Sequence, residues 1–184
     1  MSCLRWLGWR CSDRNCSGSS STIAWCDERI VAHVRSDEQA KAATQLCGIG
    51  PVTASALVAT VGDFKQCKTG AQFGSWLGVV PSQNSSGGRT SLGGITKRGD
   101  DYLRTLLIQG AKSAVMTAHK RRDRISQWLV QLVARVGWQK AVVALANKNA
   151  RILWAVLAKG RRFDANHVSV KPERPAMVVP TMAG

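Results

Sequence analysis

The sequence predicts an all-α protein: a helical domain with a helix-hairpin-helix-like element and a Ser/Gly-rich loop. From residue 22 onward, apolar residues recur at spacings of three and four, which is the pattern of a helix that buries one face. No segment alternates polar and apolar residues for long enough to predict a sheet. With 184 residues, 45% of them apolar, the chain can bury a hydrophobic core.

The N-terminal part divides into two segments. Residues 1–21 show no helical or strand period, and two interpretations stay open: a short disordered arm or an out-of-frame start. Residues 22–46 are predicted to be a helical lead-in. A first helix is expected over 22–34 and a second over 38–47, with Ser36 as the N-cap of a capping box and Gly48 as the C-cap.

The elements that follow are predicted from periodicity and from glycines. A helix over 53–61 is closed by Gly62, a short helix covers 71–78, and a loop in which a tight hairpin is an alternative covers 79–95. Longer helices are expected over 99–118, 124–136 and 138–160, before a flexible, proline-containing tail over 161–184. The core face of the first is predicted to be Leu103, Leu106, Leu107, Ala111, Ala114, Val115 and Ala118.

The charge is large and unevenly distributed. The chain carries +15, and residues 47–184 hold 20 of its 26 Lys and Arg but only 6 of its 11 Asp and Glu, a balance of +14. Such a field attracts polyanions and favours binding to nucleic acid. The competing interpretation is a basic surface that serves solubility.

The sequence argues against a metal site, a disulfide framework and a membrane-spanning segment. The six cysteines include no CxxC pair, which argues against a zinc site and against a disulfide framework. The three histidines are scattered, and no metal site is predicted. No segment is expected to be a signal peptide or to span a membrane, so the protein is expected to be cytoplasmic.

The first motif with a chemical implication is Gly48-Ile49-Gly50-Pro51 between two predicted helices. Glycines let a backbone approach a phosphate closely, and the helix that follows offers free amides at the positive end of its dipole. Gly48, Gly50 and Thr53 are therefore candidates for binding the DNA backbone. The alternative is an ordinary tight turn in which Ile49 fills the core.

The second motif lies in the Ser/Gly-rich loop and the residues after it. A flexible loop could present a serine hydroxyl to a phosphodiester, and cations around it would stabilise developing negative charge. The candidate cations are Arg89, Lys97, Arg98 and Arg104. A polar surface loop is an equally good interpretation of the spacing.

Other features carry weaker signals. The turn over residues 120–124, with sequence KRRDR, is interpreted as either a nucleic-acid backbone contact or a solvated loop. The last long helix carries a polar stripe that is a weak candidate to face nucleic acid: Asn147, Lys148, Asn149 and Arg151. The helical tryptophans are expected in the core rather than as base-stacking platforms: Trp76, Trp128, Trp138 and Trp154.

Several pieces in the same order carry a family resemblance. They are GIGPVTASALVATVGD, AQFGSWLGVVPSQNSSGGRTSLGGITKRGDDYLR and LLIQGAKSAV. Together they resemble the C-terminal domain of the insertion-sequence one-ten transposases, relatives of the Piv-type DNA invertases. The similarity extends to about residue 169, and residues 47–160 are interpreted as the transposase C-terminal DNA-binding and serine domain.

The resemblance implies a particular chemistry. Members of this family pair an N-terminal RuvC-like domain, whose four acidic residues hold divalent metal, with a C-terminal domain whose serine becomes covalently joined to DNA. Carried onto this sequence, the nucleophile is Ser86, with Ser85 as the alternative. The implied partners are element-end and target DNA, an element-encoded guide RNA and further copies of the chain, without a membrane.

The sequence departs from the family in lacking a RuvC-like domain. Its N-terminal carboxylates are too close together to replace the four metal ligands and are interpreted as an exposed helix face and a cap: Asp27, Glu28, Asp37 and Glu38. No cofactor is expected in this chain, and Mg²⁺ is expected only in the missing domain. The chain is expected to be a truncated transposase or recombinase, inactive alone. The alternatives are a non-catalytic DNA- or RNA-binding module and a decayed remnant.

Overall fold

The computed structural model describes residues 19–84 and 91–164, and these residues are mostly helical. The elements are α1 (Ser19–Ser36), α2 (Glu38–Ala43), α3 (Pro51–Val61), η1 (Phe64–Gln66), α4 (Gly70–Trp76), β1 (Pro81–Gln83), β2 (Leu92–Ile95), α5 (Asp101–Thr117), η2 (Ala118–Lys120), α6 (Arg124–Val136) and α7 (Trp138–Lys159). The predicted all-α class is confirmed, with one small hairpin added to it.

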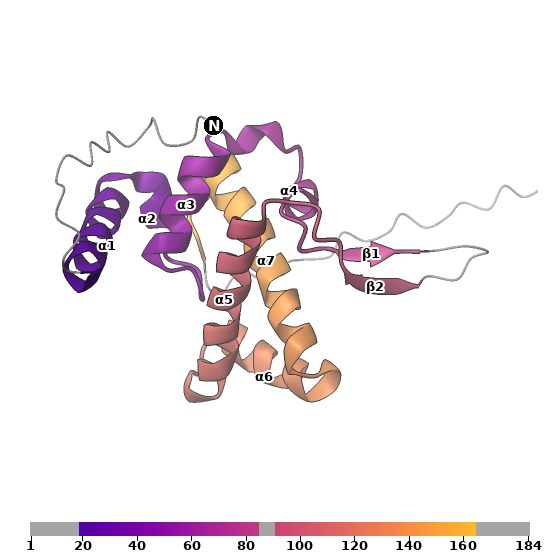
Figure 1. Ribbon diagram of the computed structural model, residues 1–184. Helices are drawn as coiled ribbons and strands as arrows, with labels where there is room; N and C mark the ends of the chain where they lie inside the picture. The colour runs from indigo at the N-terminus through magenta and orange to yellow at the C-terminus, as the bar shows by residue number, and fades with distance from the viewer. Residues whose placement is uncertain (1–18, 85–90, 165–184) are drawn as a thin grey trace, which may run out of the picture.

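Two long helices form the centre of the molecule. Helices α5 and α7 pack side by side, and α6 crosses one end of the pair, as Figure 1 shows. Helices α1, α2 and α3 lie on one side of this centre, and the β1–β2 hairpin projects from the other side (Figure 1). The central pair therefore separates α1, α2 and α3 from the β1–β2 hairpin.

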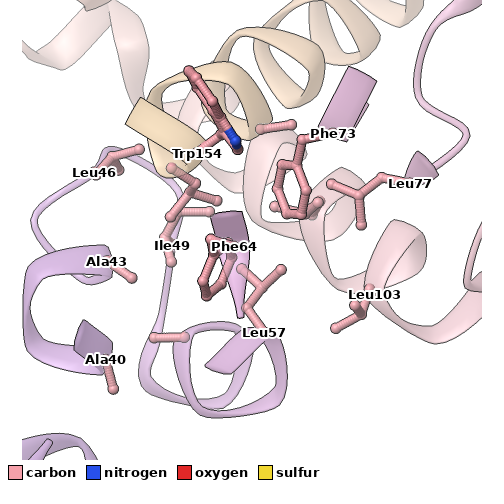
Figure 2. Packing of buried hydrophobic residues seen from close by; sticks show 14 of the residues in the cluster. Ala40, Ala43, Leu46, Ile49, Leu57, Phe64, Phe73, Leu77, Leu103 and Trp154 are labelled. Atoms are coloured by element: carbon pink, nitrogen blue, oxygen red, sulfur yellow. The ribbon is translucent and has the colours of Figure 1, made fainter. Parts of the chain in front are cut away.

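The core consists of two clusters of buried side chains. One cluster joins α2, α3, α4 and the C-terminal half of α7, with Leu57, Phe73 and Trp154 among its members (Figure 2). The Trp154 ring also donates a 2.8 Å hydrogen bond to the carbonyl of Cys67. The second cluster, which includes Leu129 and Leu145, joins α5, α6 and the N-terminal half of α7. Burying a leucine or phenylalanine contributes about 1.5–3 kcal/mol, so these clusters hold the helices together.

The three long predicted helices are confirmed as α5, α6 and α7. The expected core face of α5 is buried except for Leu106, which is half-buried. Asp100 caps α5 by accepting the amide of Leu103 at 2.8 Å. A positive φ of 87° at Gly137 turns the chain from α6 into α7, because an L-residue rarely adopts that conformation.

The predicted capping box and second helix are wrong in detail. Asp37, not Ser36, is the N-cap of α2, since its carboxylate accepts the amides of Gln39 and Ala40. The Ser36 hydroxyl instead donates to the carbonyl of His33 at 2.9 Å. Helix α2 ends at Ala43 rather than at residue 47, because the chain then turns to bury Leu46.

The predicted loop over 79–95 contains a two-stranded antiparallel sheet. Pro81 pairs with Ile95 and Gln83 with Leu92, with an irregularity in the register between them. Hydrogen bonds continue the pairing on both sides, from the Asn84 amide to the Ser91 carbonyl and from the Thr96 amide to the Val80 carbonyl. Neither strand shows a long alternation, because both are short and mostly exposed.

No segment was expected to be able to span a membrane, but this expectation is wrong for α7 when only the length and composition of the helix are considered. Trp138–Lys159 is long and apolar enough to cross a bilayer, and half of the apolar stretch is buried within the fold. The apolar residues of α7 face both core clusters, which explains why a core helix has this composition.

Candidate nucleic-acid interface

The hairpin between α2 and α3, residues 44–50, is held rigidly against the two central helices. Gly48 has a φ of 85°, and a Cβ added to it would lie 2.7 Å from the carbonyl oxygen of Gly110 on α5. Ile49 is buried in the core. The Asn149 amide on α7 donates a 2.9 Å hydrogen bond to the carbonyl of Cys47. Gly48 thus serves a backbone–backbone packing contact, and Ile49 fills the core as the alternative interpretation expected.

The exposed part of the hairpin is Gly50 with the first turn of α3. Gly50 is the N-cap of α3, and a Cβ added there would meet no atom within 4 Å. Amides in the first turn of a helix have no acceptor within the helix and carry the positive end of its dipole. Thr53 is only 6% exposed, so its side chain is not presented to solvent. Of the three predicted hairpin residues, Gly50 is therefore the one with an open approach.

The basic turn, residues 120–124, lies directly against this hairpin. The Arg121 guanidinium donates to the Sγ of Cys47 at 3.2 Å, although 74 positions separate the two residues. Burial raises the pKa of the Cys47 thiol, so this sulfur is a neutral acceptor. Four cations of the turn are exposed: Lys120, Arg121, Arg122 and Arg124.

The one carboxylate in the basic turn forms hydrogen bonds within the turn itself. Asp123 caps α6, accepting the amide of Ser126 at 3.1 Å and its hydroxyl at 2.8 Å. Burial on its own would raise the pKa of Asp123, but these hydrogen bonds outweigh it and lower the pKa below its ordinary value. The carboxylate therefore stabilises the helix start that orders the turn.

The hairpin and the basic turn enclose a hollow of about 530 Å³. It is lined by the hairpin residues from Thr44 to Ile49, by Arg121, Asp123 and Ile125, and by Phe163 beyond α7. We use the name hairpin–turn surface for four parts taken together: Gly50, the first turn of α3, this hollow and residues 120–124. Its arrangement combines open backbone amides with exposed cations, which is suited to binding phosphate oxygens.

A second basic site, the KRG turn of residues 97–99, lies at the other end of α5. Lys97 and Arg98 are exposed, and Lys97 has an unusual positive φ of 55°. Gly78 packs against this turn, since a Cβ added to it would lie 2.8 Å from the Gly99 amide nitrogen. The Lys97 amide donates to the Gly78 carbonyl at 3.3 Å, which fixes the turn against the end of α4.

Arg104, predicted to surround a phosphate, lies beneath the KRG turn. It is 7% exposed, and its guanidinium donates to the Gly99 carbonyl at 3.2 Å and pairs with Asp101. Its groups are therefore engaged by oxygens of the protein itself, and it positions the two exposed cations of the turn.

The remaining predicted site residues lie outside the described part of the chain. Ser86, its alternative Ser85, and Arg89 fall within residues 85–90, so their catalytic and binding roles stay predictions. Within residues 19–84 and 91–164, no group of three or more His, Cys, Asp or Glu could hold a metal ion. The divalent metal implied by the family resemblance therefore has no fitting ligand set among the described residues.

The polar stripe of α7 is not a continuous exposed surface. Asn149 is buried, and Lys148 is half-buried with its ammonium 4.2 Å from the centre of the Trp128 ring. Burial and the nearby charge of Arg124 lower the pKa of Lys148. These two side chains of the stripe join α7 to the hairpin and to α6. Because Asn149 and Lys148 are used in this packing, their burial does not support the prediction that the stripe faces nucleic acid.

Exposed aromatic residues were missed from the sequence, and the core position expected of Trp138 is wrong because this residue is 40% exposed. Trp76 is 43% exposed and Tyr102 is 60% exposed, while Trp154 is buried as predicted. In the short helix α4, Phe73, Gly74 and Leu77 already fill the buried face, so the helical position of Trp76 could have indicated its exposure. Nothing local in the sequence could have indicated the contact between the basic turn and the hairpin.

Comparisons with known proteins show that these motifs lie within a stretch of sequence shared with transposases. The model of the "Transposase IS116/IS110/IS902 family" matches residues 40–127, a range that contains the hairpin, the KRG turn and the basic turn. A "Probable family 20 transposase" of Pseudomonas aeruginosa is 50% identical over 137 residues, covering 74% of this chain and 40% of the relative.

Two further relatives come from named insertion sequences. The transposase for insertion sequence element IS1111A of Coxiella burnetii is 41% identical, covering 74% of this chain and 38% of the relative. The transposase for IS1328 of Yersinia enterocolitica is 39% identical, covering 75% and 41%. The chain thus spans about 40% of the length of these relatives. Through residues 40–127, the chain belongs to the transposase IS116/IS110/IS902 family.

Proposed function

We propose that this chain binds the DNA backbone through the hairpin–turn surface, as the DNA-handling part of a transposase. The observation that carries the proposal is the contact between Arg121 and Cys47. It holds the basic turn, with its four exposed cations, against the hairpin that leads into α3, and phosphates interact favourably with cations and with helix N-termini. Contacts of this kind orient a protein on DNA without reading its sequence.

We further propose that Ser86 supplies the nucleophile of strand exchange, with Ser85 as the alternative. The serine oxygen would bond to the phosphorus as the bond to one sugar oxygen breaks, and the serine proton would pass to that sugar oxygen, which leaves as a hydroxyl. The Ser-Ser-Gly-Gly sequence and the exposed cations Lys97 and Arg98, which follow it in the sequence, support this assignment. An element-encoded RNA and further copies of the chain are the additional partners that the family resemblance supports.

Replacing Gly50 with alanine tests the binding site without disturbing the fold. A methyl group at this position meets no protein atom and the backbone there is extended, so the free energy of unfolding should change by less than about 0.5 kcal/mol. The methyl group would keep a phosphate from the first-turn amides, so affinity for duplex DNA should fall about tenfold, the loss of one charge-assisted hydrogen bond. Fluorescence anisotropy with a labelled duplex measures the affinity. An unchanged affinity in a stable Gly50→Ala protein would exclude the α3 N-terminus as a contact.

The nucleophile is tested by trapping a covalent protein–DNA adduct. The chain is incubated with nicked duplexes taken from either side of its own coding sequence, and the products are separated under denaturing conditions. Any adduct that the wild-type chain forms is expected to form also with Ser85→Ala and to be lost with Ser86→Ala. An adduct lost only in Ser85→Ala would move the nucleophile by one residue. No adduct with any protein, while DNA binding persists, would leave this chain as a non-catalytic binding module.

A further inference from the structure

We propose that Trp76 and Tyr102, which flank the KRG turn, bind an unpaired nucleotide of a single strand by stacking on its base. The inference rests on the proposed nucleic-acid binding and adds a second site at the other end of α5. Trp76 ends α4, and its carbonyl oxygen packs directly against Gly99. Tyr102 lies three residues after Gly99, in the first turn of α5. Two residues with exposed rings therefore adjoin the same turn from two elements.

The Trp76 ring is already held in place in the absence of a ligand. One of its faces stacks on Phe73, with ring centres 5.8 Å apart and ring planes 17° from parallel. Phe73 is fully buried and packs in turn on Phe64, at 5.6 Å between ring centres. Because Trp76 is nevertheless 43% exposed, it forms a fixed platform that loses little conformational entropy on binding.

The charges around this platform favour a nucleotide over an apolar partner. Lys97 and Arg98 are exposed on the turn that Trp76 and Tyr102 adjoin, where they can bind phosphates. The nearby carboxylates are both engaged, because Asp100 caps α5 and Asp101 pairs with Arg104. The cations of the turn are therefore left to neutralise a ligand's negative charge.

The geometry favours a single strand because a ring can stack only on a base that has left its own stack. In a duplex the base faces are covered by their neighbours, whereas single strands commonly bind proteins through aromatic platforms beside basic grooves. The hairpin–turn surface, in contrast, offers backbone amides and cations that suit duplex phosphates. The two sites are thus expected to respond differently to the same set of nucleic acids.

Anisotropy with three labelled probes tests this site. The probes are oligo-dT and oligo-rU of about 15 nucleotides and a duplex of about 20 base pairs. Trp76→Leu retains an apolar cover over Phe73 but removes the stacking face, and Tyr102→Ala removes the second ring. Trp138→Ala is the matched control, because Trp138 is 40% exposed but begins α7, at the opposite end of the central helix pair from the KRG turn (Figure 1). Thermal unfolding verifies that each variant is folded.

The expected result is a loss of about tenfold in single-strand affinity for Trp76→Leu and a smaller loss for Tyr102→Ala. Duplex affinity and the Trp138→Ala protein should be unchanged. A loss restricted to oligo-dT or to oligo-rU supports the site and identifies DNA or RNA as its ligand. Wild-type single-strand affinity in folded Trp76→Leu, or an equal loss on the duplex, overturns the site while leaving the hairpin–turn surface intact. Failure of the wild-type chain to bind the duplex would instead contradict the proposed function.

Discussion

Replacing Gly110 with alanine is expected to destabilise the fold by about 2–3 kcal/mol, the largest stability effect of any substitution considered. A Cβ on Gly110 would overlap the carbonyl oxygen of Gly48 in the hairpin. Neither backbone can easily withdraw, because Asn149 holds the adjacent Cys47 carbonyl and Ile49 is buried. Overpacking of this kind costs about 3 kcal/mol, which outweighs the gain of up to about 1 kcal/mol that alanine brings to a helix.

Thermal unfolding followed by circular dichroism measures this effect. For a chain of this length, a loss of 2–3 kcal/mol lowers the melting temperature by roughly 5–10 °C. The control is Gln109→Ala, one position away on the exposed side of α5, which should change stability by less than about 0.5 kcal/mol. A Gly110→Ala protein as stable as the wild type would contradict the close contact between the hairpin and α5.

The helices of this fold follow from local sequence, but their ends depend on tertiary contacts. The spacing of apolar residues predicted α5, α6 and α7 because each is long and buries one face. The end of α2 was not predicted, since it is set by the burial of Leu46 in a core shared with other elements. The cap assigned to Ser36 was wrong because neighbouring Asp37 also has a side chain suited to capping.

The pieces of the candidate site could be found in the sequence, but their assembly could not. The hairpin glycines and the basic turn are both visible as motifs, yet only the fold brings Cys47 and Arg121 together. Arg104 was predicted at a phosphate because of its charge, and its long side chain instead reaches back to the start of its own helix. Trp76 was expected in the core because tryptophan is usually well buried, although its position on the short helix α4 indicates exposure.

The affinity of the chain for duplex DNA is expected to fall about 10³-fold when the salt concentration rises from about 50 to about 200 mM. Six exposed cations lie on the two basic sites: Lys97, Arg98, Lys120, Arg121, Arg122 and Arg124. If each neutralises one phosphate, the slope of log affinity against log salt is about −5, because each contact releases about 0.9 of a counterion. A fourfold rise in salt concentration then reduces the affinity about 10³-fold, which is far more than the roughly tenfold loss expected for Gly50→Ala.

The double variant Lys120→Ala/Arg122→Ala assigns part of this slope to the basic turn. Both side chains are exposed, and Arg121, which holds the turn against Cys47, is retained. The slope should become less steep by about 2, so that the same change in salt lowers affinity only about 10²-fold. Lys65→Ala is the control, because Lys65 is exposed beyond the C-terminal end of α3, opposite to Gly50. A wild-type slope in the double variant would remove the basic turn from the interface, and salt-independent binding would show that the positive charge of this chain does not bind DNA.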